Sequence, residues 1–240
     1  MAGMLFSALL DRSDIWRGDS LSRAGASVVS SGFAELDAGL PGGGWPVGTL
    51  TEILPAHAGI GELRLLGPAL ASRRGSRLAW IAPPYLPYAP ALAAAGFDIA
   101  SLIVVRAASH RETLWAAEQA LASNACGAVL AGLSGAKYAE EKYAELRRLQ
   151  IAAEGGRAPA FLFRPPEVSS EASPAALRIA LGTSGGGLAV DVFKRRGTPL
   201  ARPILLPAMP PAVRTRSFHV DRHPAAAAAA RDFPARLVHA

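Results

Sequence analysis

Apolar runs of strand length recur along this chain from residue 28 to about residue 195, and their spacing constrains the fold more than any other feature. Amphipathic helical patterns separate the earlier runs, whereas a glycine-rich segment, residues 182–187, joins the last two. Continuous apolar strands that alternate with helices indicate a parallel sheet covered on both faces. The sequence therefore predicts an α/β fold with a mostly parallel sheet and a C-terminal antiparallel hairpin that closes one edge. The predicted strands are Gly48–Leu54, Leu78–Ala82, Leu102–Val105, Ala128–Leu133, Ala160–Phe163, Arg178–Leu181 and Leu188–Phe193.

Three segments have the periodicity of helices that pack one face against a sheet. Gly61–Arg73 places leucines at positions i, i+3 and i+7. Ser109 and Glu112 have the spacing of a capping box, so a helix is expected to begin there. Tyr138–Glu154 carries apolar residues at the same helical spacing and ends before Gly155, a residue type that commonly follows a helix C-terminus.

Composition divides the 240-residue chain into three parts. Residues 1–27 hold a short apolar segment and a polar link, which form either a helix packed on its own core or an arm that docks on a neighbour. Residues 28–207 form the predicted core. Residues 208–240 are rich in proline and alanine, and residues 212–240 contain five arginines against two aspartates. We expect a flexible basic tail, which is either a solvated end or a salt-sensitive arm for nucleic acid or a partner.

The segment from Ser30 to Gly61 has the layout of the entry to a nucleotide-binding P-loop, but it lacks the residues that hold phosphate. A Walker A loop reads G-x-x-x-x-G-K-S/T. Its backbone N–H groups cradle the phosphates, its lysine neutralises their charge and its hydroxyl binds Mg²⁺. No lysine precedes Lys137 in this chain. The sequence therefore predicts a degenerate P-loop that binds no nucleotide cofactor, formed by Pro55, Ala56, His57, Ala58, Gly59, Ile60 and Gly61.

The predicted strand ends also lack the acidic residue that a P-loop enzyme needs for Mg²⁺ or for activating water. The run Leu78–Ala82 is followed by Pro-Pro-Tyr, and the run Ala128–Leu133 by Ser-Gly. No G-x-S-x-G motif supports a hydrolase triad. A lone histidine in a loop, such as His57, is more often structural than catalytic. We therefore expect no catalytic residues and no enzymatic activity.

Metal sites and membrane spans find little support in the sequence. Cys126 is the only cysteine, which excludes an internal disulfide and a multi-cysteine metal site. His219 and His223 have a spacing that could hold a metal on a helix, but no carboxylate or thiol cluster adjoins them, so no metal is expected. No run approaches the ~20 apolar residues that a membrane span needs, and no signal peptide is evident. We expect a cytoplasmic protein without membrane contact.

Basic residues, mostly arginine, are the remaining candidates for a binding surface. The formal net charge is +6, and only three of the 25 lysines and arginines are lysine. Arginine binds phosphate and carboxylate groups bidentately. The candidate positions form either solvated faces or docking sites for an acidic protein or DNA. They are Arg147, Arg148, Lys194, Arg195, Arg196, Arg214 and Arg216.

Several blocks of sequence resemble known families. Ser30–Leu40 (S-S-G-F-x-x-L-D-x-x-L) and Gly43–Glu52 (G-G-W-P-x-G-x-L-x-E) are similar to the segments that precede the P-loop strand in the RecA recombinase core. More specifically, Leu146–Glu154 (L-R-R-L-Q-I-A-A-E) and Ala160–Pro165 (A-F-L-F-R-P) resemble the ImuA family, which is related also to the SulA cell-division inhibitors. The resemblance covers about residues 28–206.

This resemblance implies a RecA-like core without ATP-driven strand exchange, because Ile60 and Gly61 stand at the P-loop lysine and threonine positions. It implies a nucleoid-associated accessory protein of SOS-induced translesion DNA synthesis. The implied partner is ImuB, a Y-family polymerase homologue, and through it an error-prone replicative-type polymerase. RecA or a second copy of the chain are further implied partners, and direct DNA contact would be weak. Two alternatives remain: a SulA-like inhibitor that binds the tubulin-like division protein, and a residual ATPase.

Overall fold

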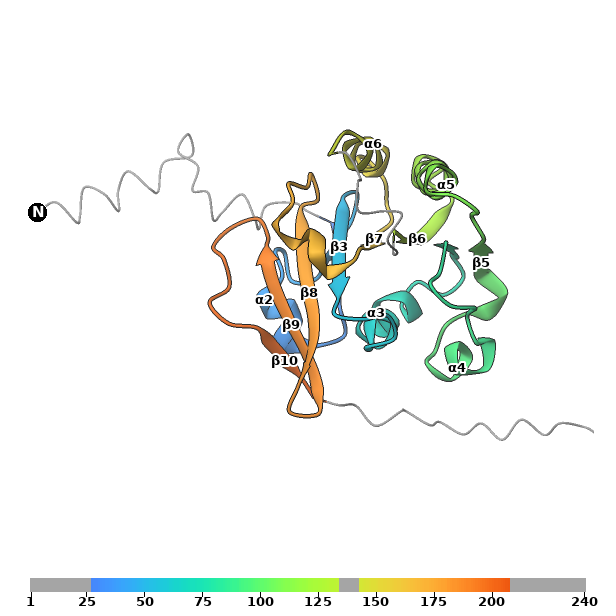
Figure 1. The fold of residues 1–240 in the computed structure, drawn as a ribbon. Coiled ribbons are helices and arrows are strands. Elements are labelled where there is room, and N and C mark those ends of the chain that lie inside the picture. The colour runs from blue at the N-terminus through green and yellow to red at the C-terminus, as the bar shows by residue number, and fades with distance from the viewer. Residues whose placement is uncertain (1–26, 134–142, 208–240) are drawn as a thin grey trace, which may run out of the picture.

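A computed structural model describes residues 27–133 and 143–207 and shows an eight-stranded sheet between two layers of helices (Figure 1). The strand order is β10-β9-β8-β3-β7-β6-β4-β5. All pairs from β8 to β5 are parallel, whereas β8 with β9 and β9 with β10 are antiparallel. The strands are β3 (Leu50–Pro55), β4 (Arg77–Ile81), β5 (Leu102–Val105), β6 (Cys126–Gly132), β7 (Ala160–Phe163), β8 (Leu177–Ser184), β9 (Gly187–Lys194) and β10 (Ile204–Leu206).

The predicted α/β architecture and all seven predicted strands are confirmed. Strands of a parallel sheet are buried on both faces, so they appear in the sequence as continuous apolar runs. The expectation that the β8–β9 hairpin closes one edge is wrong. A three-residue strand, β10, pairs with β9 and forms that edge instead. The buried side chain of Leu206 anchors this strand. The strand was not predicted because it is short and because Pro203 and Pro207 flank it.

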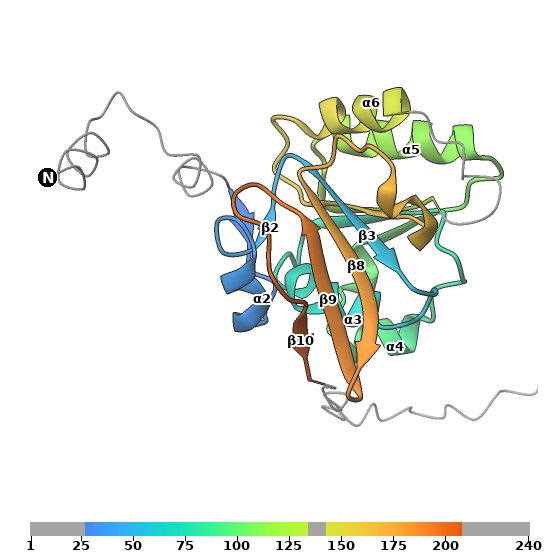
Figure 2. The same ribbon diagram turned by 60° about the vertical axis from the view of Figure 1, so that its left-hand side comes forward.

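Helices cover both faces of the sheet (Figures 1 and 2). Two helices lie on one face: α5 (His110–Ala122) and α6 (Tyr143–Ala153). Three lie on the other: α2 (Ala34–Gly39), α3 (Glu62–Ala71) and α4 (Ala89–Ala94). Figure 2 shows α2 beside β9 and β10. The described part of α6 begins at Tyr143, so the predicted start at Tyr138 falls outside the described residues.

Local sequence accounts for the start of α5. The Ser109 hydroxyl accepts a hydrogen bond from the backbone N–H of Glu112 at 3.2 Å. The Glu112 carboxylate in turn accepts one from the backbone N–H of Ala108 at 2.8 Å. This reciprocal arrangement satisfies two N–H groups that have no partner within the helix, so the predicted helix start is confirmed.

Two hydrophobic clusters separate along the two faces of the sheet. The first joins α2, α3 and α4 to the sheet, and in it Trp45 meets Phe161 edge to face at 5.3 Å between ring centroids. The second joins α5 and α6 to the sheet through residues such as Leu121 and Leu146. Full burial of each large apolar side chain contributes roughly 1.5–3 kcal/mol, so the two clusters hold both layers.

Smaller elements complete the described chain. A two-stranded antiparallel ribbon, β1 (Val28–Val29) with β2 (Trp45–Pro46), precedes β3. Two 3₁₀ turns follow later, η1 (Ile99–Ser101) and η3 (Pro166–Ser170). None of the helices in the described ranges is long and apolar enough to cross a membrane.

Candidate functional site

The residues predicted to form the degenerate P-loop comprise Pro55, the last residue of β3, and the turn that joins β3 to α3. This turn starts at Ala56, whose backbone N–H donates to the carbonyl of Leu181 in β8 at 2.9 Å. It ends at Gly61, the residue before α3. Gly59 and Gly61 both have positive φ angles, +83° and +128°, which glycine adopts without steric cost. The chain therefore turns sharply from the carboxyl end of a central strand into a helix N-terminus.

The carboxylate of Glu62 occupies the inside of this turn. Its Oε1 accepts a hydrogen bond from the backbone N–H of Gly59 at 2.8 Å, and its Oε2 accepts one from Gly61 at 3.0 Å. The Glu62 residue is only 9% exposed. Backbone N–H groups at a helix N-terminus are the donors that usually bind an anionic ligand. Here the chain supplies its own anion, so a phosphate would have to displace a tethered carboxylate.

Gly61 is also closely packed against the hairpin. A Cβ atom added at this position would lie 2.9 Å from Cδ2 of Leu188 in β9. A lysine, serine or threonine here would therefore need both a strained φ and a displaced leucine. Ile60 beside it packs against the first hydrophobic cluster. His57 is exposed, and its Nδ1 lies 3.3 Å from the carbonyl oxygen of Ala58 in the same turn.

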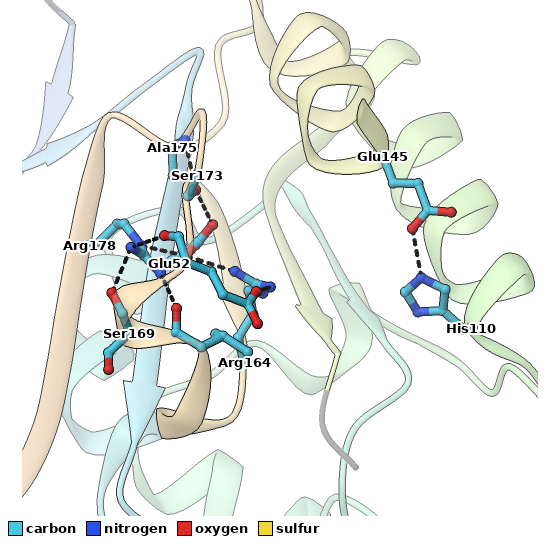
Figure 3. A network of polar contacts seen from close by, with 10 residues as sticks. Glu52, His110, Glu145, Arg164, Ser169, Ser173, Ala175 and Arg178 are labelled. Carbon is cyan, nitrogen blue, oxygen red and sulfur yellow. Dashed lines mark hydrogen bonds and ion pairs between the residues drawn. The ribbon is translucent and has the colours of Figure 1, made fainter. Parts of the chain in front are cut away.

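A second polar cluster is buried at the middle of the sheet, and Figure 3 shows its side chains converging on Glu52. Glu52 lies in β3 with a fully buried side chain. Arg178 Nε in β8 donates to its Oε2 at 2.8 Å, and Arg164 Nη1 after β7 donates to the same oxygen at 3.3 Å. Ser173 donates its hydroxyl to Oε1. A buried carboxylate with three donors is fully satisfied and has a structural role.

The two arginines of this cluster also fasten the chain that follows β7. Arg178 donates to the backbone carbonyls of Val168, Ser169 and Glu171 at 2.8–3.0 Å. Arg164 Nη2 pairs with the Glu171 carboxylate at 3.2 Å. The turn η3 and the segment after it are thereby fixed over β3 and β8. We assign the cluster to architecture, because every carboxylate oxygen of Glu52 has a protein partner.

Lys194, a predicted docking residue, belongs to the edge of this cluster. Its Nζ donates to the Ser173 carbonyl at 2.6 Å. Burial lowers the pKa of Lys194, the neighbouring Arg178 lowers it further, and Glu52 acts in the opposite direction.

No protein-family model matches the chain. The chain is 33% identical over 190 residues to Protein ImuA of Caulobacter vibrioides, strain NA1000 / CB15N, which covers 68% of this chain and 72% of that protein. Protein ImuA of a second strain, ATCC 19089 / CIP 103742 / CB 15, matches with the same identity and coverage. The chain belongs to the ImuA family.

The predicted docking residues of this ImuA-family chain lie on different elements and most already have partners. In α6, Arg148 pairs with Glu118 of α5 at 2.6 Å, and Arg147 pairs with Glu154 at 3.6 Å. After β9, Arg195 donates to the carbonyls of Gly39 and Thr198. Arg196 is exposed. Arg214 and Arg216, like the arm of residues 1–26 and the tail from residue 208, lie outside the described residues.

Sequence reasoning missed Glu62, the residue whose carboxylate occupies the N–H donors of the turn. In the sequence, Glu62 resembles an ordinary acidic residue in the first turn of a helix, where its negative charge interacts favourably with the helix dipole. Its return to Gly59 and Gly61 depends on the positive φ angles of the two glycines. The spacing Gly59-x-Gly61-Glu62 was the available signal, because it places a carboxylate directly after two flexible N–H donors.

Proposed function

We propose that this ImuA-family chain is a non-catalytic, RecA-like accessory protein of SOS-induced translesion DNA synthesis. In this proposal it assembles an error-prone polymerase complex with an ImuB-type partner. The non-catalytic part of the proposal depends on one observation: the Glu62 carboxylate accepts hydrogen bonds from the backbone N–H groups of Gly59 and Gly61. The family membership supports the translesion part.

Further features of the turn and the sheet support the non-catalytic part of the proposal. Catalysis of phosphoryl transfer needs cations and donors arranged around the phosphates. In the described chain the strands β4 and β6 end in Ile81 and Gly132 and are followed by Ala82 and Leu133, so no carboxylate is placed there for Mg²⁺. The turn itself presents a negative charge where a phosphate would require positive charge.

An exposed apolar surface supports partner binding. No charged residue lies between Arg77 and Asp98. Within this stretch Tyr85, Leu86 and Tyr88 are 68%, 82% and 70% exposed. The adjacent strand β5 forms an edge of the sheet with Ile103 and Val104 exposed (41% and 38%). Apolar and aromatic side chains beside an unpaired strand edge suit a protein partner that adds an extended segment. Consecutive strand residues point to opposite sides of a sheet, so Ile103 and Val104 lie on the two sides of the β5 edge. We use the name β5 face for the exposed apolar residues of this edge and of the segment after β4: Tyr85, Leu86, Tyr88, Ile103 and Val104.

Titration calorimetry with ATP and Mg²⁺ tests the non-catalytic part. We expect no saturable binding heat and no phosphate release, with a RecA protein as the positive control. Micromolar binding with turnover would contradict the proposal and restore the residual ATPase.

Co-purification with an ImuB-type partner tests the assembly part. We expect the full-length chain to retain the partner and the Leu86→Asp variant to lose it. The matched control is Ile151→Asp on α6, which introduces the same charge at an exposed aliphatic position and should retain the partner. Thermal unfolding of both variants checks that each is folded. Retention by Leu86→Asp would reject the β5 face, and capture of the division protein without the ImuB-type partner would reject the function.

A further inference from the structure

A polar groove of about 370 Å³ lies at the amino ends of β4 and β6. Its lining includes Arg73, Arg77, Arg157, Asn124 and Cys126. Because β3 runs parallel to these strands, the groove and the turn that holds Glu62 lie at opposite ends of the sheet. The groove is therefore separate from the candidate site described above.

The arginines reach this groove from two parts of the chain, the connection between α3 and β4 and the loop before β7. Arg73 follows α3, Arg77 begins β4, and Arg157 lies between α6 and β7. Arg73 is held in place because its Nε donates to the Gly127 carbonyl at 3.0 Å and its Nη2 to the Arg157 carbonyl at 2.7 Å. These two bonds use only part of its five N–H donors. Arg77 and Arg157 are exposed.

The positive charge of the groove is not neutralised within the described chain. No ion pair among the described residues involves Arg73, Arg77 or Arg157. An acidic residue, Asp98, lines the adjoining depression, and its carboxylate accepts hydrogen bonds from Ser101 Oγ and the Ala100 N–H. Arginine remains charged at any physiological pH, so the three arginines that line the groove keep positive charges that a polyanion would neutralise.

We propose that this groove binds the phosphodiester backbone of DNA. The guanidinium groups of Arg73, Arg77 and Arg157 contact phosphate oxygens, and the amide of Asn124 adds a neutral donor. The residues that line the groove include no aromatic side chain on which a base could stack. Contacts of this kind hold DNA without reading its sequence, and they weaken as salt rises because bound counterions are released. This inference rests on charge and shape and does not depend on the proposed partner.

Fluorescence anisotropy of the full-length chain with short labelled duplexes of unrelated sequence tests the inference. The test variant is Arg77→Ala with Arg157→Ala, because neither side chain makes a hydrogen bond or ion pair in the described chain. The matched control is Arg106→Ala with Arg111→Ala, which removes the same charge from two exposed positions at the other end of the sheet and on α5.

We expect the wild-type chain to bind duplexes of different sequence equally well, with an affinity that falls as salt increases. The test variant should lose about tenfold or more in affinity, and the slope of log affinity against log salt should fall by roughly 1.8, about 0.9 for each lost phosphate contact. The control should change either quantity much less. Equal effects in the two double variants would overturn the inference. Displacement of DNA by micromolar tripolyphosphate would assign the groove to a small phosphorylated ligand and would overturn it as well.

The same double variant separates this inference from the proposed function. The test variant should still co-purify with the ImuB-type partner, because the β5 face is unchanged. Loss of DNA binding with retention of the partner supports the groove alone. Retention of DNA binding together with loss of the partner contradicts the groove and leaves the proposed function to be judged by the Leu86→Asp variant.

Discussion

Arg178 Nε lies 2.8 Å from Glu52 Oε2 where β8 pairs with β3, and both residues are buried. Arg178 also donates to three backbone carbonyls of residues 168–171. One guanidinium thus joins the sheet to the segment that covers it. Removing one partner of a buried ion pair leaves an uncompensated charge, which costs far more than losing a surface pair.

The first prediction concerns this pair. Arg178→Leu should lower the free energy of unfolding by about 3–5 kcal/mol, because Glu52 and the three carbonyls lose donors. Urea denaturation at neutral pH measures the change. The exposed Arg106→Leu serves as the control and should stay within about 0.5 kcal/mol of the wild type. A change of similar small size in Arg178→Leu would show that the network contributes little.

The second prediction concerns the β3–α3 turn and the Glu62 carboxylate inside it. Glu62→Ala should lower the free energy of unfolding by about 1 kcal/mol, because the N–H groups of Gly59 and Gly61 lose their acceptor. Those donors then become open to an external anion. Sulfate should therefore raise the melting temperature of the variant more than that of the wild type. An identical response of both proteins to sulfate would show that the N–H groups do not bind an anion.

The third prediction separates backbone strain from packing at two glycines. Gly59→Ala and Gly61→Ala both place alanine at a positive φ, which costs about 1–2 kcal/mol. A Cβ at Gly59 meets nothing within 4 Å, whereas one at Gly61 lies 2.9 Å from Leu188. Gly61→Ala should be the more destabilising change, and adding Leu188→Ala should relieve part of its effect. Purely additive double-variant energies would reject the packing explanation.

The fourth prediction is a pH dependence at Asp37. Burial acts to raise the pKa of Asp37, but hydrogen bonds from Ser30 and Ser31 outweigh it, so the pKa lies below its ordinary value. A lowered carboxyl pKa stabilises the fold above the unfolded-state pKa, and the contribution disappears as pH falls through the folded-state value. Asp37→Asn should therefore flatten the loss of stability below about pH 4. Melting temperatures of the two proteins across the acidic range test this; parallel curves would contradict it.

Patterns that are local in sequence predicted most of the fold. The helix α5 was predictable because Ser109 and Glu112 cap it within four residues, and β7 was predictable from its unbroken apolar run. The short strand β10 and the helix α4 were missed, since three to six residues beside prolines carry too little periodicity to be recognised.

The buried cluster at Glu52 and the arginine-lined groove were less predictable because both depend on contacts between distant residues. Glu52 meets Arg164 and Arg178 across more than a hundred residues of chain. Arg73 and Arg157 meet only because the parallel strands start at a common edge. Sequence reasoning selected adjacent pairs such as Arg147 and Arg148 instead, and their charges are balanced by Glu154 and Glu118.

The carboxylate in the β3–α3 turn has one consequence for timing. Because Glu62 is only one and three residues along the chain from its donors, Gly61 and Gly59, the effective concentration of its carboxylate at the turn is millimolar or higher and does not depend on metabolite levels. In a protein that is switched by nucleotide hydrolysis, the rate of hydrolysis limits the lifetime of the active state. If the chain has the proposed function, no hydrolysis step limits the lifetime of an assembly built on it. That lifetime is then set by how fast the partners dissociate and by how much of the chain the cell makes.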